Sequence, residues 1–215
     1  MLLLVIFSLY IRKRLSLVPS KIQLASEIVV GGLFSLFESI TGNKTKKFFP
    51  FLATLFLLIL FLNWTGLLPG VGTIGLKEAE HGSEVFIPLF RAGSADLNTT
   101  LAFAIVTVLV IQYFGIKTLG KEYLGRFFNF KNPIMFFVGF LELISEGTKI
   151  ISFAFRLFGN IFAGEVLLTV IAFLIPLIVP LPFLAMELFV GLIQALVFSM
   201  LAAVFLNQAT TSHEH

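Results

Sequence analysis

Apolar residues of this chain gather in long blocks separated by short polar stretches. Three blocks are long enough to cross a bilayer as helices: Phe48–Leu68, Leu97–Ile116 and Pro133–Gln208. About 20 helical residues span the roughly 30 Å of hydrocarbon in a bilayer. The last block is interrupted by three prolines, which cannot continue a helix without losing a hydrogen bond: Pro176, Pro180 and Pro182. We therefore predict a hairpin of two helices, Ile134–Leu174 and Leu181–Gln208.

The first helix of this hairpin is too long to stand upright in a membrane. At 1.5 Å per residue, Ile134–Leu174 would run about 60 Å, roughly twice the hydrocarbon thickness. We expect it to tilt strongly, to lie almost in the membrane plane, or to break near one of three glycines, Gly147, Gly159 or Gly164.

Two segments near the N-terminus differ from these blocks. In Ile22–Ser39, the polar residues Gln23, Glu27 and Glu38 interrupt a shorter apolar stretch, which is typical of an amphipathic helix in the membrane interface. The first eleven residues are apolar and precede a basic cluster, Arg12–Arg14, an order opposite to that of a secretory signal peptide. We expect this segment to be retained. Because eleven residues cannot span the bilayer, we also expect the sequence to begin partway through a span.

The composition agrees with a membrane protein. Hydrophobic residues make up 58% of the chain and charged residues 13%, whereas soluble domains carry about 45–50% and about 25%. The prediction is one all-α membrane domain over residues 1–215, with about five membrane helices and one interfacial amphipathic helix. We expect the last two membrane helices to form a long tilted or near-horizontal hairpin.

The positions of Lys and Arg predict the orientation, because short cytoplasmic loops carry the excess of these residues. Eleven of the 15 lie in two stretches, Arg12–Lys47 and Lys117–Lys131, which we place inside. The loop Gly70–Asp96 holds two basic residues against four acidic ones, so we place it outside. The turn at Pro176 is then outside, and the C-terminal tail, Ser212–His215, is inside.

Six ionisable residues lie within the apolar hairpin: Glu142, Glu146, Lys149, Arg156, Glu165 and Glu187. Such groups cost about 2.5–3.5 kcal/mol each at mid-bilayer, and they commonly mark ion pathways or proton relays. Glu142, Lys149 and Arg156 recur every seven residues and therefore share one helix face. Ser145 and Ser152 lie alongside at the same spacing, so this face is a polar stripe.

Arg156 has no acidic residue within four positions. Glu165 lies nine positions further on, about 180° around a helix, so the two side chains face opposite ways. Arg156 therefore needs another partner, and the candidates are Asn160, Gln194, water or a carboxylate on another protein. Because arginine stays protonated, it attracts, repels or blocks ions but cannot relay protons. Glu165 and Glu187 are the opposite case, because a low-dielectric site favours the neutral carboxylic acid and makes both candidates for proton exchange.

Several of these residues also have ordinary structural interpretations. Glu142, Glu146 and Lys149 are spaced to pair with one another along a helix. Gly159 and Gly164 permit close packing of helices. Gln194 can form an ordinary interhelical hydrogen bond. Asp96, with Ser94, can serve as the N-cap of the helix that begins at Leu97.

One segment resembles a known family signature. The residues Phe-Arg-Leu-Phe-Gly-Asn-Ile-Phe-Ala-Gly-Glu of Phe155–Glu165 are similar to the signature of subunit a, the stator ion channel of F-type ATP synthase. Further similarities lie along most of the chain: Pro19, Gln23 and Glu27, Ser94–Thr99, Glu142 and Lys149, Glu187–Phe189, Gln194–Phe198, and the His/Glu tail. The sequence departs from the family at its N-terminus, where the family has a complete first span.

The resemblance implies a non-catalytic subunit with two half-channels beside a rotating ring of c subunits. Arg156 would face the ring carboxylate, displace its proton and block leakage between the half-channels. The other residues assigned to proton translocation are Glu165, Glu187, Asn160 and Gln194 on the inlet path, Asp96 and Asn98 at its outer opening, and Ser152, Glu142 and Lys149 on the polar stripe.

The implied partners are the c-ring, subunit b of the peripheral stalk and the remaining F-type ATP synthase subunits. The implied location is the bacterial plasma (inner) membrane, with a cytoplasmic C-terminus, and no cofactor, metal ion or nucleic acid is expected.

Two other classes of function are a stand-alone secondary transporter, with Arg156 binding an anionic substrate, and a structural scaffold. Transporters commonly have inverted repeats, which this sequence does not show. A scaffold would not need six costly intramembrane charges.

Overall fold

The structure is a computed structural model that describes residues 20–68, 75–80, 83–88, 92–120, 123, 125, 127, 133–175 and 178–211. Several sequence-based predictions fall outside the described residues. They are the incomplete N-terminal span, the match at Pro19, the turn at Pro176 and the inside tail Ser212–His215.

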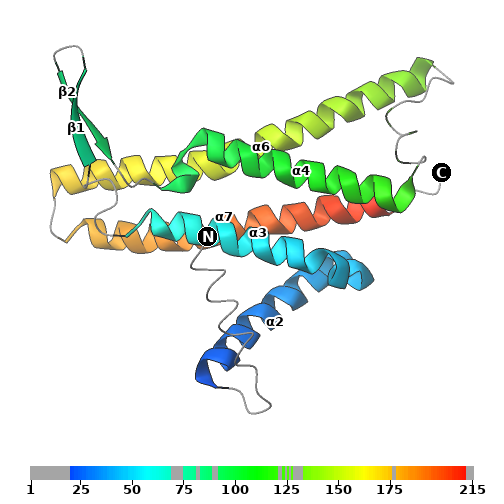
Figure 1. Cartoon of the computed structure of the whole chain (residues 1–215), viewed down its shortest axis with the longest axis horizontal. Helices are drawn as coiled ribbons and strands as arrows, with labels where there is room; N and C mark the ends of the chain where they lie inside the picture. The colour runs from blue at the N-terminus through cyan, green and yellow to red at the C-terminus, as the bar shows by residue number, and fades with distance from the viewer. Residues whose placement is uncertain are drawn as a thin grey trace.

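Five helices form most of the described chain (Figure 1). They are α2 (Lys21–Thr41), α3 (Thr45–Thr65), α4 (Leu97–Leu119), α6 (Pro133–Leu174) and α7 (Pro180–Thr210). Two short 3-10 helices, η1 (Gly42–Lys44) and η2 (Gly93–Ala95), precede α3 and α4. Four helical stretches of the described residues are long and apolar enough to cross a membrane: Lys21–Thr65, which joins α2 and α3, then α4, α6 and α7. The prediction of an all-α membrane protein is confirmed, while the count of about five spans and the interfacial position of α2 stay predictions.

A small β-hairpin is the element that the sequence did not predict. Strand β1 (Gly75–Glu80) pairs antiparallel with β2 (Ser83–Pro88), and Gly75 lies opposite Pro88. The hairpin projects from the helices in Figure 1 and belongs to the loop that charge placed outside. It adds two strands to the fold and leaves the helical layer unchanged.

The helix ends follow from local chemistry. The side chain of Ser20 accepts a hydrogen bond from the Gln23 amide at the start of α2, and Asp96 caps α4 in the same manner. Gly42 and Gly120 end α2 and α4 with φ angles of 53° and 58°, a region that other residues rarely adopt. These signals explain why the observed bounds lie close to the predicted ones.

Helix α6 is continuous over 42 residues, about 63 Å. A break near Gly147, Gly159 or Gly164, one of the three alternatives considered, is therefore absent. Strong tilting and an in-plane position stay predictions for a helix of this length. An isolated glycine costs a helix only about 1 kcal/mol, which the interhelical contacts of α6 can offset. Figure 1 shows α6 running alongside α7 over its C-terminal part.

Helix α7 is the centre of the bundle, because it packs against α2, α3, α4 and α6. Small buried residues along α7 let these helices approach closely: Ala195, Ser199, Ala202, Ala203 and Ala209. Large side chains from the neighbours complete the core: Phe48 and Leu52 of α3, Ile111 of α4, and Phe153 and Leu157 of α6. In the most apolar segment of α6, only 17% of the residues are buried, against 33% in the corresponding segment of each of the other three helical stretches. Among the described residues, α6 is therefore the least covered of the four helical stretches.

A cation fixes the C-terminal end of α7. Lys44 Nζ donates to the carbonyl oxygen of Thr210 at 2.8 Å and lies 3.3 Å from the hydroxyls of Thr210 and Thr211. Nearby, Asn207 Nδ2 donates to the carbonyl oxygen of Ile40 at 3.0 Å. Positive charge at a helix C-terminus satisfies the last carbonyls and complements the helix dipole. The turn between α2 and α3 is therefore anchored to the end of α7.

Candidate functional site

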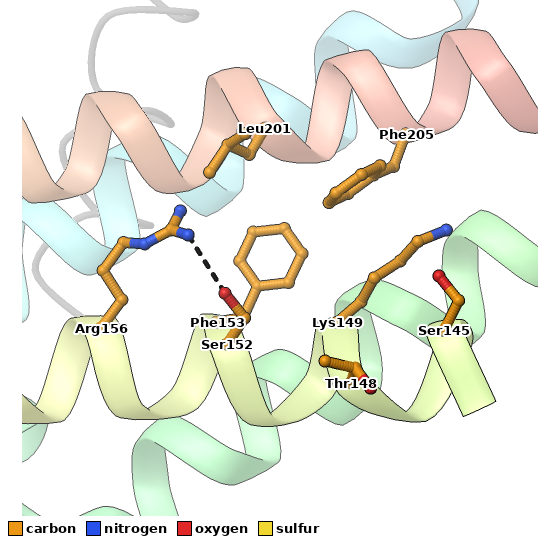
Figure 2. A pocket seen from close by; sticks show the side chains of 8 residues that line it. All are labelled: Ser145, Thr148, Lys149, Ser152, Phe153, Arg156, Leu201 and Phe205. Carbon is orange, nitrogen blue, oxygen red and sulfur yellow. Dashed lines mark hydrogen bonds between the residues drawn. The ribbon is translucent and has the colours of Figure 1, made fainter.

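The polar stripe of α6 lines a groove of about 270 Å³ against α7 (Figure 2). Its lining residues are Ser145, Thr148, Lys149, Ser152, Phe153 and Arg156 from α6, and Leu201 and Phe205 from α7. In Figure 2, Arg156 and Lys149 both extend from α6 toward α7. The predicted stripe is confirmed for Ser145, Lys149, Ser152 and Arg156, because all four side chains face one groove.

Arg156 receives little compensation from the described residues. Its Nη2 donates a hydrogen bond to Ser152 Oγ at 3.1 Å, one turn earlier on α6. Within the described part of the chain, no carboxylate forms an ion pair with Arg156. Asn160 and Gln194, the two partners that the sequence offered, make no hydrogen bond with it there. Arg156 is half-buried, and its guanidinium extends from α6 toward α7 in the groove of Figure 2.

The second cation of the groove is paired. Lys149 Nζ lies 2.6 Å from Glu146 Oε1, and the two side chains are 20% and 16% exposed. The same ammonium lies 4.6 Å from the ring centre of Phe205 on α7. The i, i+3 pairing considered from the sequence is therefore formed by Glu146 and Lys149, while Glu142 lies half-buried one turn before Glu146.

Glu187 of α7 is buried directly against α6. Its side chain is 5% exposed, and a β-carbon on Gly164 of α6 would overlap its carboxyl group. Oε1 of Glu187 has no hydrogen-bond partner among the described residues. The neighbouring Glu165 is partly buried, with Oε2 inaccessible to solvent. Gly164 is thus required for helix packing, as the sequence suggested, because it makes room for a carboxyl group.

The remaining predicted residues occupy separate positions. Antiparallel packing pairs Phe153 with Phe198 and Gly164 with Glu187, so Asn160 and Gln194 lie at similar heights on α6 and α7. Asn160 is exposed and Gln194 is half-buried.

Asp96 is confirmed as the N-cap of α4. Its Oδ1 accepts a hydrogen bond from the Asn98 amide at 2.9 Å, and both side chains are exposed. Ser94, which the sequence analysis considered for the same cap, is buried in η2 and its hydroxyl has no hydrogen-bond partner among the described residues. Asp96 therefore has a structural role whatever else it does.

Three polar residues of this region were not predicted from the sequence. Asn63 of α3 is buried and donates from Nδ2 to the carbonyl oxygen of Gly191 at 2.9 Å, one turn from Glu187. Gln112 of α4 and Tyr123 form a hydrogen-bonded chain to Glu146. Each lies in or beside an apolar block, and a polar residue at such a position is the sequence signal that could have identified them.

Comparison with known proteins identifies the family of this chain. A sequence model of the family described as ATP synthase A chain matches residues 1–207. ATP synthase subunit a of Citrifermentans bemidjiense is 36% identical over 215 residues, which cover 99% of this chain and 84% of that protein. ATP synthase subunit a of Geobacter sp. strain M21 is similar to the same extent. The chain therefore belongs to the ATP synthase A chain family.

Proposed function

We propose that this chain is the proton-translocating stator subunit of an F-type ATP synthase. In this role it is non-catalytic and provides two half-channels beside a rotating ring of c subunits. It couples proton flow across the bacterial plasma membrane to ATP synthesis, and its C-terminus lies in the cytoplasm. The observation that carries the proposal is the position of Arg156 on the least covered helix, with only a serine hydroxyl as partner in the described chain.

A charge inside an apolar helix requires compensation from somewhere. An intramembrane arginine costs several kcal/mol, and such residues pair or mark ion pathways. Because Ser152 is neutral and no carboxylate of the described residues pairs with Arg156, we infer that the compensating charge comes from another protein. A carboxylate on the c-ring meets this requirement. Its proton is displaced when it meets Arg156, and the permanent charge of the guanidinium repels protons that would cross directly.

The surface around Arg156 suits a protein partner. Ser152, Phe155, Gly159 and Asn160 are exposed on α6 within one turn of it. A β-carbon on Gly159 would meet no atom of the described chain within 4 Å, so the space beside this helix is open. Small and polar residues next to a charge allow the close approach of another helix. We assign this face to the c-ring.

Buried polar atoms support the inlet half-channel. Glu187 Oε1, Asn63 Oδ1 and Ser94 Oγ are buried without a hydrogen-bond partner among the described residues. Buried polar groups nearly always have a partner, and ordered water supplies it where protein does not. We infer that water reaches Glu187 and Glu165 along this side of the bundle. Asn160 and Gln194 lie between these carboxyls and Arg156, and Asp96 and Asn98 mark the outer opening.

The groove of Figure 2 is the outlet half-channel in this proposal. It begins at Arg156 and continues past Ser152 to Lys149, a distance of about 10 Å along the helix axis. Exposed hydroxyls of Ser145 and Ser152 line it, which suits a path for water and protons. Glu142 lies seven residues before Lys149, about two further helical turns along α6.

The test is ATP-driven proton pumping in inverted membrane vesicles that contain the whole complex. We expect Arg156→Ala to abolish pumping, because the ring carboxylate then keeps its proton, while the complex still co-purifies. The matched control is Lys117→Ala, which removes an exposed cation of α4 in contact with Tyr113. Normal pumping by an assembled Arg156→Ala complex would overturn the proposal.

A second variant tests the inlet path. Glu165→Gln keeps the size of the side chain but removes its ability to exchange protons, so we expect slower proton flux through the complex. Wild-type flux in Glu165→Gln would exclude Glu165 from the path. The role of Arg156 is tested separately by Arg156→Ala.

A further inference from the structure

A continuous chain of polar contacts joins the segment after α4 to α7. Tyr123 Oη donates to Gln112 Oε1 at 2.7 Å, and Gln112 Nε2 donates to Glu146 Oε2 at 2.8 Å. Lys149 Nζ then donates to Glu146 Oε1 at 2.6 Å and lies 4.6 Å from the ring centre of Phe205. We call Tyr123, Gln112 and Glu146 the holding chain of Lys149.

The holding chain fixes its members more firmly than an ordinary ion pair. Exposed Lys–Glu pairs move freely and contribute little. Here each oxygen of the Glu146 carboxylate has its own donor, and Gln112 uses both ends of its amide. Gly115 makes room for the Tyr123 ring, because a β-carbon there would lie 2.7 Å from it. The carboxylate is therefore held in one orientation beneath Lys149.

The position of Lys149 matters because it shares the groove with Arg156. The two cations lie two helical turns apart, about 10 Å. A proton that leaves the ring at Arg156 and follows this groove passes Lys149 as a positively charged species. Without Glu146, the groove would present two uncompensated cations in succession. With Glu146, the described residues leave Arg156 as the groove's uncompensated cation.

We propose that the holding chain keeps Lys149 neutralised so that protons can leave the groove, and that Gln112 and Tyr123 are positioning residues for proton release. The proposal rests on the proposed function, because it takes the groove as the outlet. The physical reason is Coulomb repulsion, which is strong near a partly desolvated charge and weak near a paired one. Tyr123 and Gln112, which lie outside the hairpin, thereby influence the rate of proton release, because they hold the carboxylate that neutralises Lys149.

The experiment measures passive proton flux, driven by a potassium diffusion potential, in vesicles containing the complex without its ATPase head. Glu146→Gln keeps the shape of the side chain and removes its charge. We expect it to lower flux about five- to tenfold, because Lys149 then repels protons in the groove. Combining Glu146→Gln with Lys149→Gln removes the repelling charge, and flux should return to within about twofold of wild type.

A matched control separates this effect from a general change in charge. Lys117→Gln also removes a lysine in contact with an aromatic ring, that of Tyr113 on α4, but Lys117 does not line the groove. Combined with Glu146→Gln, it should leave flux as low as in the single variant. Tyr123→Phe removes one hydroxyl from the holding chain. We expect flux to fall about twofold and to be restored by Lys149→Gln.

Two results would overturn the proposal. One is wild-type flux in an assembled Glu146→Gln complex, and the other is a Glu146→Gln/Lys149→Gln complex that is as slow as Glu146→Gln alone. The second result would mean that Glu146 only supports packing. If Glu146→Gln does not assemble, the Tyr123→Phe pair of variants decides the question by the same comparison. Failure of the proposed function is recognised separately, by normal pumping in Arg156→Ala.

Discussion

Replacing Gly164 by alanine should disturb one carboxyl group and little else. Gly164 lies on α6 where the Glu187 carboxyl group of α7 rests against its backbone. A β-carbon there would overlap Oε1, Oε2 and Cδ of Glu187, which is 5% exposed. The carboxyl group would have to leave its position, or α6 and α7 would have to move apart.

The effect on stability should be small because two contributions oppose each other. Overpacking a buried contact costs about 1–3 kcal/mol. Alanine inside a helix is about 1 kcal/mol more favourable than glycine. The net loss is therefore about 0–2 kcal/mol, which a complex of several subunits tolerates. The effect on proton flux should be much larger, at least about tenfold, because a displaced Glu187 no longer lines the inlet.

The assay compares ATP-driven pumping with the amount of assembled complex in the same vesicles. Gly147→Ala is the matched control, because it adds the same methyl group to the same helix at a position where no atom of the described residues lies within 4 Å. We expect normal pumping in Gly147→Ala and strongly reduced pumping in Gly164→Ala. Adding Glu187→Asp, which shortens the carboxyl side chain, should recover part of the loss. Equal pumping by the two glycine variants would refute the reasoning.

Two further predictions concern the helix ends. Lys44→Gln removes the cation that binds the Thr210 carbonyl, so we expect a loss of about 1–2 kcal/mol in local stability and faster amide exchange near the end of α7, measured by mass spectrometry. Lys46→Gln, at an exposed neighbouring position, is the control, and equal exchange in both variants would contradict the anchoring role of Lys44. Asp96→Ala should cost about 1 kcal/mol and let the first turn of α4 fray, whereas Asp96→Asn should preserve the turn because asparagine caps equally well. Fraying in both variants would show that the cap depends on charge.

Much of the helical architecture could be predicted from local sequence. The block Ile134–Leu174 was expected as one helix, and α6 covers Pro133–Leu174. Apolar length and proline positions suffice for this, because a helix in lipid satisfies its backbone hydrogen bonds internally. The opposite orientation of Arg156 and Glu165 also follows from helical geometry alone. The β1–β2 hairpin was missed because its strands lie in the loop between two apolar blocks and show no sustained alternation of apolar and polar residues.

The contacts that define the candidate site depended on tertiary structure. Gln112 and Glu146 lie 34 positions apart, and Lys44 and Thr210 lie 166 apart. Their meeting depends on how far each helix is rotated and shifted against α7, which is fixed by the packing of small residues and cannot be derived from one helix at a time.

The sequence by itself determined that Arg156 is a permanent charge in an apolar helix, with no acidic residue within four positions of it. The tertiary structure decided which charges in the groove are compensated. It paired Lys149 with a carboxylate held from α4 and left Arg156 with a serine hydroxyl. The physical reason is that an ionic partner acts through space over a few ångströms, so only the packed arrangement of several helices determines which charge has one.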